Sequence, residues 1–212
     1  MSARAVMNMG RAVLFGALLA CTAPAFAQDA PSTMPPGLRP YYDTLLAEGE
    51  WGAVLNLQRL GLEAIDQGNL DVAERAFDAA LERIELIYAN SDSAKKARSL
   101  WSSEGSKDFK GEPYERAMTY YYRGLLFMAR GDYENARASF RSAEYQDTIS
   151  GHETYAGDFG LMSLLSGWSS TCAGDAGMAA DFYQRAASQQ PGGLKPPATG
   201  RTTLVLVESG TS

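Results

Sequence analysis

The sequence contains few of the residues from which catalytic and metal sites are usually built, with one histidine and two cysteines among 212 residues. Zinc sites and disulfide scaffolds need more of these residues at fixed spacings, so neither is expected, and we expect no metal or cofactor. Charged residues make up only 21%, and the formal net charge is -6, which disfavours a general nucleic-acid binder. The 45% hydrophobic content indicates a globular protein rather than a disordered chain.

Catalytic patterns are equally scarce. The single imidazole, His152, lies in a Ser-Gly-His-Glu stretch that is typical of a turn entering a helix. The other chemically active side chain, Cys172, is expected near a helix C-terminus followed by an acidic residue, where the pKa of a thiol rises. There is no glycine-rich phosphate loop. We therefore expect a protein that is not an enzyme.

The N-terminal segment, 1–27, has the pattern of an export signal. Arg4 and Arg11 precede an apolar run at 12–20, which is too short to span a membrane. Two processing routes stay open: cleavage after Ala27, or removal of residues 1–20 with Cys21 as a lipidated N-terminus. Both predict an exported, periplasmic protein, and the second predicts anchoring to the outer membrane through lipid on Cys21.

A tether is expected to follow the export signal. Residues 28–40 carry four prolines and no apolar periodicity, which predicts an extended segment ahead of a helical domain at 41–192. Removal of residues 1–27 takes away two of the 19 basic residues and no acidic residue, so the exported chain is more acidic than the whole.

One set of spacings occurs three times in the chain. Each copy has two glycines, an alanine, an aromatic residue and a second alanine, at successive offsets of 7, 5, 4 and 3 along the sequence. The copies are Gly61, Gly68, Ala73, Phe77 and Ala80; Gly124, Gly131, Ala136, Phe140 and Ala143; and Gly167, Gly174, Ala179, Tyr183 and Ala186. This spacing resembles the tetratricopeptide repeat (TPR). The resemblance implies an all-α, TPR-like solenoid of antiparallel helix pairs, with repeats at about 51–86, 114–147 and 154–191.

Each repeated position has an expected packing role. The first glycine lets the two helices of a pair approach closely, and the second ends the first helix with a positive φ. The aromatic residue is expected to fill space between one repeat and the next, and Asn69, Asp132 and Asp175 to cap the second helices. None of these positions is expected to contact a ligand.

The repeats are unevenly spaced, which predicts an inserted helix and loop at about 91–112. A short helix is expected from Ser93 to Trp101, and a new helix at Pro113. The insertion and its edge carry a basic and aromatic set: Lys95, Lys96, Arg98, Trp101, Lys107, Phe109, Lys110 and Tyr114. Two interpretations stay open, a solvated helix start or a site for an anionic glycan, a lipid headgroup or a peptide carboxylate.

A more specific resemblance rests on residues 107–118, Lys-Asp-Phe-Lys-Gly-Glu-Pro-Tyr-Glu-Arg-Ala-Met, followed by three tyrosines at 120–122 and Gly-Asp-Tyr at 131–133. These motifs resemble a family of uncharacterised exported bacterial TPR proteins, many of them lipoproteins, over roughly Leu55 to Val207. In longer members a segment like 203–210 opens a strand-rich region. The resemblance implies a β-prone tail at 193–212 and a short or truncated family member.

The concave face of such a solenoid is the expected binding surface. Partner-binding candidates are Tyr121, Leu125, Met128, Leu164 and Trp168, with Tyr121 and Trp168 as anchors. Gln58, Leu62 and Met118 are expected on the same face. Alternatively, the insertion or a helix containing Tyr41 and Tyr42 covers these side chains.

Three functions stay open at this point. The first is a non-enzymatic adaptor that binds proteins during cell-envelope assembly or secretion. The second is a glycan- or lipid-binding module that uses the basic insertion. The third is an accessory part of an enzyme whose catalytic region is absent.

Overall fold

The computed structural model describes residues 34–98, 113–148, 159–190, 193–198 and 200–208, and these residues form helices and connecting segments without a strand. This confirms the expected all-α class. The helices are α1 (Arg39–Asp66), α2 (Leu70–Arg98), α3 (Pro113–Arg130), α4 (Tyr133–Thr148), α5 (Gly160–Cys172) and α6 (Ala176–Gln189). None of them is long and apolar enough to cross a membrane.

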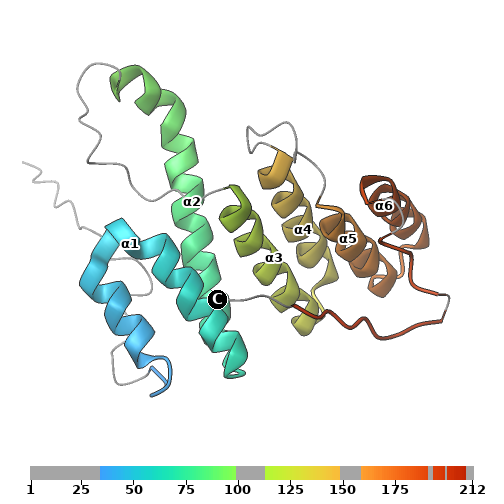
Figure 1. Ribbon diagram of the computed structural model, residues 1–212, viewed down its shortest axis with the longest axis horizontal. Coiled ribbons are helices and arrows are strands. Elements are labelled where there is room, and N and C mark those ends of the chain that lie inside the picture. Colours follow the sequence, from blue (N-terminus) through green and yellow to red (C-terminus); the bar gives the residue numbers. More distant parts are fainter. Residues whose placement is uncertain (1–33, 99–112, 149–158, 191–192, 199, 209–212) are drawn as a thin grey trace, which may run out of the picture.

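The helices form three consecutive antiparallel pairs, and each helix packs against its neighbours in the sequence (Figure 1). Short turns join the helices of each pair at the three predicted glycines, Gly68, Gly131 and Gly174. Their φ angles of 71, 76 and 82° lie in the left-handed region that glycine tolerates. Two of the predicted caps form, because Asp132 accepts from the Asn135 N–H at 3.3 Å and Asp175 from the Met178 N–H at 3.0 Å.

The repeated aromatic residues each pack on the first glycine of their own pair. A Cβ added to Gly124 would lie 2.5 Å from the Phe140 ring, and one added to Gly61 would lie 2.7 Å from Phe77. Gly167 has the same relation to Tyr183, at 2.6 Å. Phe77 also stacks on Tyr122 of the next pair, with ring centroids 5.8 Å apart, and Phe140 shares a cluster with Met162 and Leu165 of α5, as expected for rings between repeats. Each ring of the second helix lies directly on the glycine of the first.

The polypeptide joins the helical core earlier than expected. Met34 and Leu38 are buried in the cluster between α1 and α2, and α1 already begins at Arg39. Residues 34–40 are therefore part of the fold and not of a tether, because their apolar side chains have a core to pack against. Gly49, at φ 61° and ψ -151°, then bends α1 sharply.

The inserted segment also differs from expectation. The predicted break at 90–92 is absent, and α2 continues to Arg98. Asn90, Ser91 and Asp92 have modest helix propensities, but none of them forces a helix to end. Residues 99–112 lie outside the described residues, whereas α3 begins at Pro113 as predicted.

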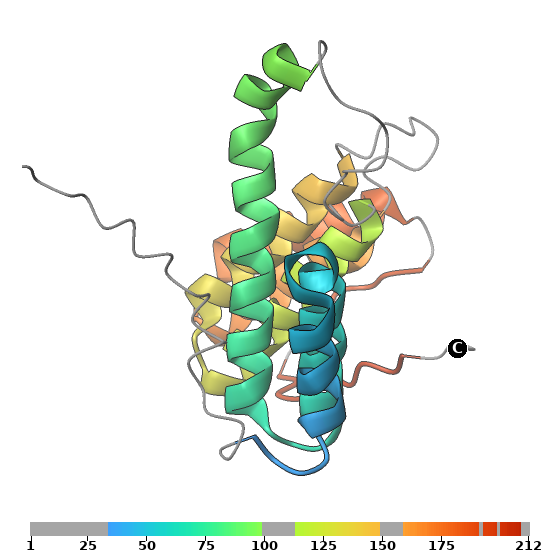
Figure 2. The ribbon, with the colours of Figure 1, turned by 90° about the vertical axis from the view of Figure 1, so that its left-hand side faces the viewer.

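The C-terminal segment, expected to be a β-prone tail, packs on the helices. Residues 200–208, here called the tail, form no strand and pack on the helices. The tail runs back from α6 beneath α5 toward α3 (Figure 1). It lies on the side of the molecule that carries α1, opposite α2 (Figure 2). Leucines of the tail find an apolar surface there, which replaces the missing strand partner.

Candidate functional site

The predicted binding residues are mostly covered. Tyr121 is 2% exposed, Trp168 6% and Leu164 9%, whereas Leu125 and Met128 are half-buried. Tyr121, Leu125 and Met128 belong to one hydrophobic cluster, against which Leu204 and Leu206 of the tail also pack. The expectation that α3 presents an open groove was therefore wrong. The tail covers part of this surface. The sequence had suggested other covers, namely the insertion or the helix containing Tyr41 and Tyr42.

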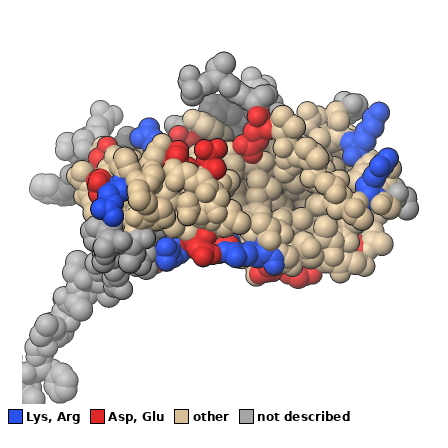
Figure 3. All heavy atoms as spheres, turned by 90° about the horizontal axis from the view of Figure 1, so that it is seen from below, with Lys and Arg blue, Asp and Glu red and all other residues tan. Residues whose placement is uncertain are grey.

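We call the covered surface the tail face and define it by Tyr121 and Tyr122 of α3 and Met162 and Leu165 of α5. The buried core of the cluster includes Tyr121, Met162 and Leu165, and Tyr122 packs at its edge. Seen from below, the Lys, Arg, Asp and Glu side chains gather in separate patches with uncharged surface between them (Figure 3).

The tail alternates between buried and exposed side chains. Leu204 and Leu206 point to the cluster, whereas Val205 is 75% and Val207 84% exposed. Residues 202–208 make no backbone–backbone hydrogen bond with other described residues. This extended segment is therefore held on the helices without backbone–backbone hydrogen bonds, by contacts that include those of Leu204 and Leu206.

Two tyrosines bind the carboxylate at the end of the tail. The hydroxyls of Tyr121 and Tyr122 donate to the two oxygens of Glu208 at 2.7 and 2.9 Å. Burial first, and then the hydrogen bond and charge of Glu208, raise the pKa of Tyr121, and the same causes raise the pKa of Tyr122 to about 12. Both hydroxyls are therefore protonated donors at neutral pH.

A hollow of about 240 Å³ adjoins this carboxylate position, bordered by Tyr122. It lies between α1, α2 and α3 and is lined by Gln58, Leu62, Phe77, Tyr114, Glu115, Met118, Thr119 and Tyr122. Gln58 donates to Thr119 Oγ1 at 2.6 Å, which satisfies the main polar groups of the wall. Three residues expected on the concave face, Gln58, Leu62 and Met118, are thus brought together in what we call the Leu62 hollow.

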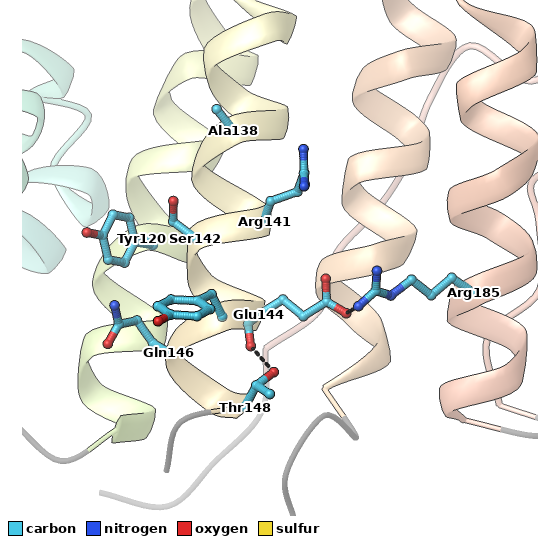
Figure 4. Close-up of a pocket in the computed structure, with 9 residues that line it drawn as sticks. Tyr120, Ala138, Arg141, Ser142, Glu144, Gln146, Thr148 and Arg185 are labelled. Carbon is cyan, nitrogen blue, oxygen red and sulfur yellow. Dashed lines mark hydrogen bonds and ion pairs between the residues drawn. The ribbon is translucent and has the colours of Figure 1, made fainter.

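A larger hollow of about 720 Å³ lies beside α4, with walls from α3, α4 and α6 (Figure 4). Its buried carboxylate, Glu144, pairs with Arg185 at 2.8 Å and accepts from Gln189 at 2.7 Å. Ser163 of α5 also donates to Glu144, at 3.4 Å. Glu144 therefore ties α4, α5 and α6 together, and this role explains its burial without a ligand.

Most of the remaining candidate residues lie outside the described part of the chain. Cys21, His152, Trp101, Lys107, Phe109 and Lys110 lie outside the described residues, as do the side chains of Lys95, Lys96 and Arg98. Tyr114 is exposed at the rim of the Leu62 hollow. Cys172 is exposed, and partial burial of its thiol raises its pKa. Within the described ranges no three His, Cys, Asp or Glu residues gather in a way that could hold a metal ion.

Comparison with known protein families, curated proteins and solved structures gives no match. Glu208 and the two tail leucines were not predicted as site residues from the sequence. The signal for them was present, because Leu204, Leu206 and Glu208 alternate with exposed valines.

Proposed function

We propose that the chain is a non-enzymatic, TPR-like adaptor that binds an extended segment of another protein across the tail face and the Leu62 hollow. The observation that carries this proposal is that these helices already hold an extended segment through Leu204, Leu206 and Glu208. The three helix pairs with the same glycine–aromatic packing support the repeat architecture.

The chemistry of the surface suits a peptide better than a small polar molecule. Apolar side chains of α3 and α5 take leucines, and paired tyrosine hydroxyls take a carboxylate. Burying leucines and adding two hydrogen bonds to a charged group are the usual sources of affinity in such grooves. Alternation of the bound residues provides sequence selectivity at every second position.

Photo-crosslinking tests the proposal. Benzoylphenylalanine in place of Leu62, which is 40% exposed at the hollow, should give a discrete crosslinked partner in cells. The same group in place of Glu82, an exposed residue of α2 outside the hollow, serves as the matched control and should give none. Equal crosslinking at both positions, or none at Leu62, would contradict a partner at this surface.

We further propose that the adaptor works in the cell envelope, because the N-terminal segment, 1–27, has the pattern of an export signal. Lipid attachment at Cys21 is testable by radioactive palmitate labelling. Labelling that is lost in Cys21→Ala, together with a protein that no longer sediments with membranes, is the expected result. Unlabelled wild-type protein with an N-terminus at Gln28 would instead establish cleavage without a lipid anchor.

A further inference from the structure

We propose that residues 204–208 are a built-in ligand of the tail face, and that the partner segment carries the same chemistry: two leucines separated by one residue and a carboxylate two residues later. The inference rests on the proposed function and specifies its ligand. In the free protein the tail would then compete with the partner for the same surface.

The contacts of the tail are those of a ligand rather than of a structural element. Leu204 and Leu206 enter the hydrophobic cluster, and Glu208 ends the segment on the Tyr121 and Tyr122 hydroxyls. No backbone–backbone hydrogen bond joins residues 202–208 to other described residues. The segment can therefore leave without breaking the backbone hydrogen bonds of any helix.

The connection to α6 makes the competition intramolecular. The segment 190–203, which separates α6 from Leu204, includes three prolines and three glycines. Described residues of this connection are mostly exposed, so few contacts fix its path. A short linker gives an effective concentration on the order of millimolar. A partner segment of equal intrinsic affinity must therefore reach about this concentration to displace the tail.

The Leu62 hollow offers a partner segment additional contacts, which would let it displace the tail. It adjoins Tyr122, where Glu208 binds, and its lining includes Leu62, Phe77 and Met118. In this chain Glu208 is followed by Ser-Gly-Thr-Ser, which has no large apolar side chain to fill it. A partner with a large apolar residue soon after its carboxylate gains contacts that the tail lacks.

The test compares peptide binding to full-length variants. The probe is a fluorescein-labelled peptide with the sequence of residues 202–212, followed by fluorescence anisotropy. A released-tail variant, L204S/L206S/E208Q, should bind the peptide at least tenfold more tightly than the wild type, if the intrinsic Kd is about 0.1 mM. The matched control V205S/V207S changes only outward-facing residues and should bind as the wild type does.

Two further measurements identify the contacts. The peptide with Glu208→Gln should bind the released-tail variant at least threefold more weakly than the original peptide does. Adding Tyr121→Phe and Tyr122→Phe to that variant should remove the difference in affinity between the two peptides. The peptide with Gly210→Phe should bind more tightly than the original. Circular dichroism at 222 nm verifies that each variant is folded, and the single variant Glu208→Gln provides the least disruptive release of the tail.

Several outcomes would overturn the proposal. Equal peptide binding by the wild type, the released-tail variant and the control would show that the tail does not compete. Absence of binding to a folded released-tail variant at about 1 mM peptide would show that the surface does not take this segment. A wild-type dimer in light scattering that the released-tail variant lacks would show that the tail belongs on a second copy. Because the titration needs no cellular partner, its failure is distinguishable from failure of crosslinking at Leu62.

Discussion

Replacing Phe140 with alanine is expected to lower the free energy of unfolding by about 3–5 kcal/mol. The ring is fully buried and lies against Gly124, where an added Cβ would come within 2.5 Å of it. It belongs to the cluster that also includes Tyr121 and Met162, so its removal leaves a cavity shared by α3, α4 and α5. Urea unfolding followed by circular dichroism measures the loss, and Arg141→Ala, at an exposed position of α4, is the control expected to change stability by less than about 0.5 kcal/mol.

A substitution at Gly124 tests the contact between this position and Phe140. Gly124→Ala alone should destabilise by about 1–3 kcal/mol, because the new Cβ overpacks against the ring despite the better helix propensity of alanine. With Phe140→Ala the same Cβ enters empty space. The double variant should therefore be at least as stable as Phe140→Ala alone. Simple additivity of the two losses would contradict direct contact between these positions.

The repeated packing positions could be predicted from the sequence because their partners are close along the chain. Gly124 and Phe140 lie on consecutive helices joined by one turn, and Gly131 determines where that turn falls. Glycine, alanine and aromatic residues at fixed spacings leave few ways to pack two helices. The spacing alone did not show that one ring contacts both pairs, as Phe77 does with Gly61 of its own pair and Tyr122 of the next.

The tail could not be placed from the sequence for a different reason. Glu208 binds Tyr121 and Tyr122, which lie 87 and 86 residues earlier in the chain. Alternating apolar residues suit both a strand and a segment lying on helices, and only the surface that they meet decides between them. The burial of Tyr121 has the same origin in part, since Glu208 and the tail leucines come from the far end of the chain.

The acidic side chains of α2 also make contacts that their spacing in the sequence does not predict. Asp78 follows Arg75 by three residues, a spacing that suits an exposed ion pair within one helix. In the structure Asp78 pairs across to Arg123 of α3, and Glu74 pairs with Arg130 of α3. Tyr120 donates to Glu85 farther along the same two helices, at 3.1 Å. A row of acidic groups therefore aligns α2 with α3 at the junction of the first two helix pairs.

Within this row, loss of the Asp78 charge should have the largest effect. The side chain of Arg123 is 10% exposed, and its guanidinium donates to Asp78 at 2.6 and 3.1 Å while lying 3.7 Å over the Phe127 ring. Asp78→Asn leaves this nearly buried cation without its anion, so we expect a loss of about 1–3 kcal/mol. The lower part of the range allows for solvent around Asp78, whose side chain is 56% exposed. Urea unfolding measures the loss.

A second substitution distinguishes a buried charge from ordinary surface attraction. Arg123→Met with Asp78→Asn should recover part of the stability lost in Asp78→Asn, since Nη1 of Arg123 has no hydrogen-bond partner among the described residues and methionine needs none. The control is Arg130→Met: the side chain of Arg130 is 47% exposed, so its removal should cost much less stability than Asp78→Asn, by an amount that decreases with salt. If Arg130→Met were as damaging as Asp78→Asn, or if 1 M salt abolished both effects, burial of Arg123 would not be what holds the two helix pairs in register.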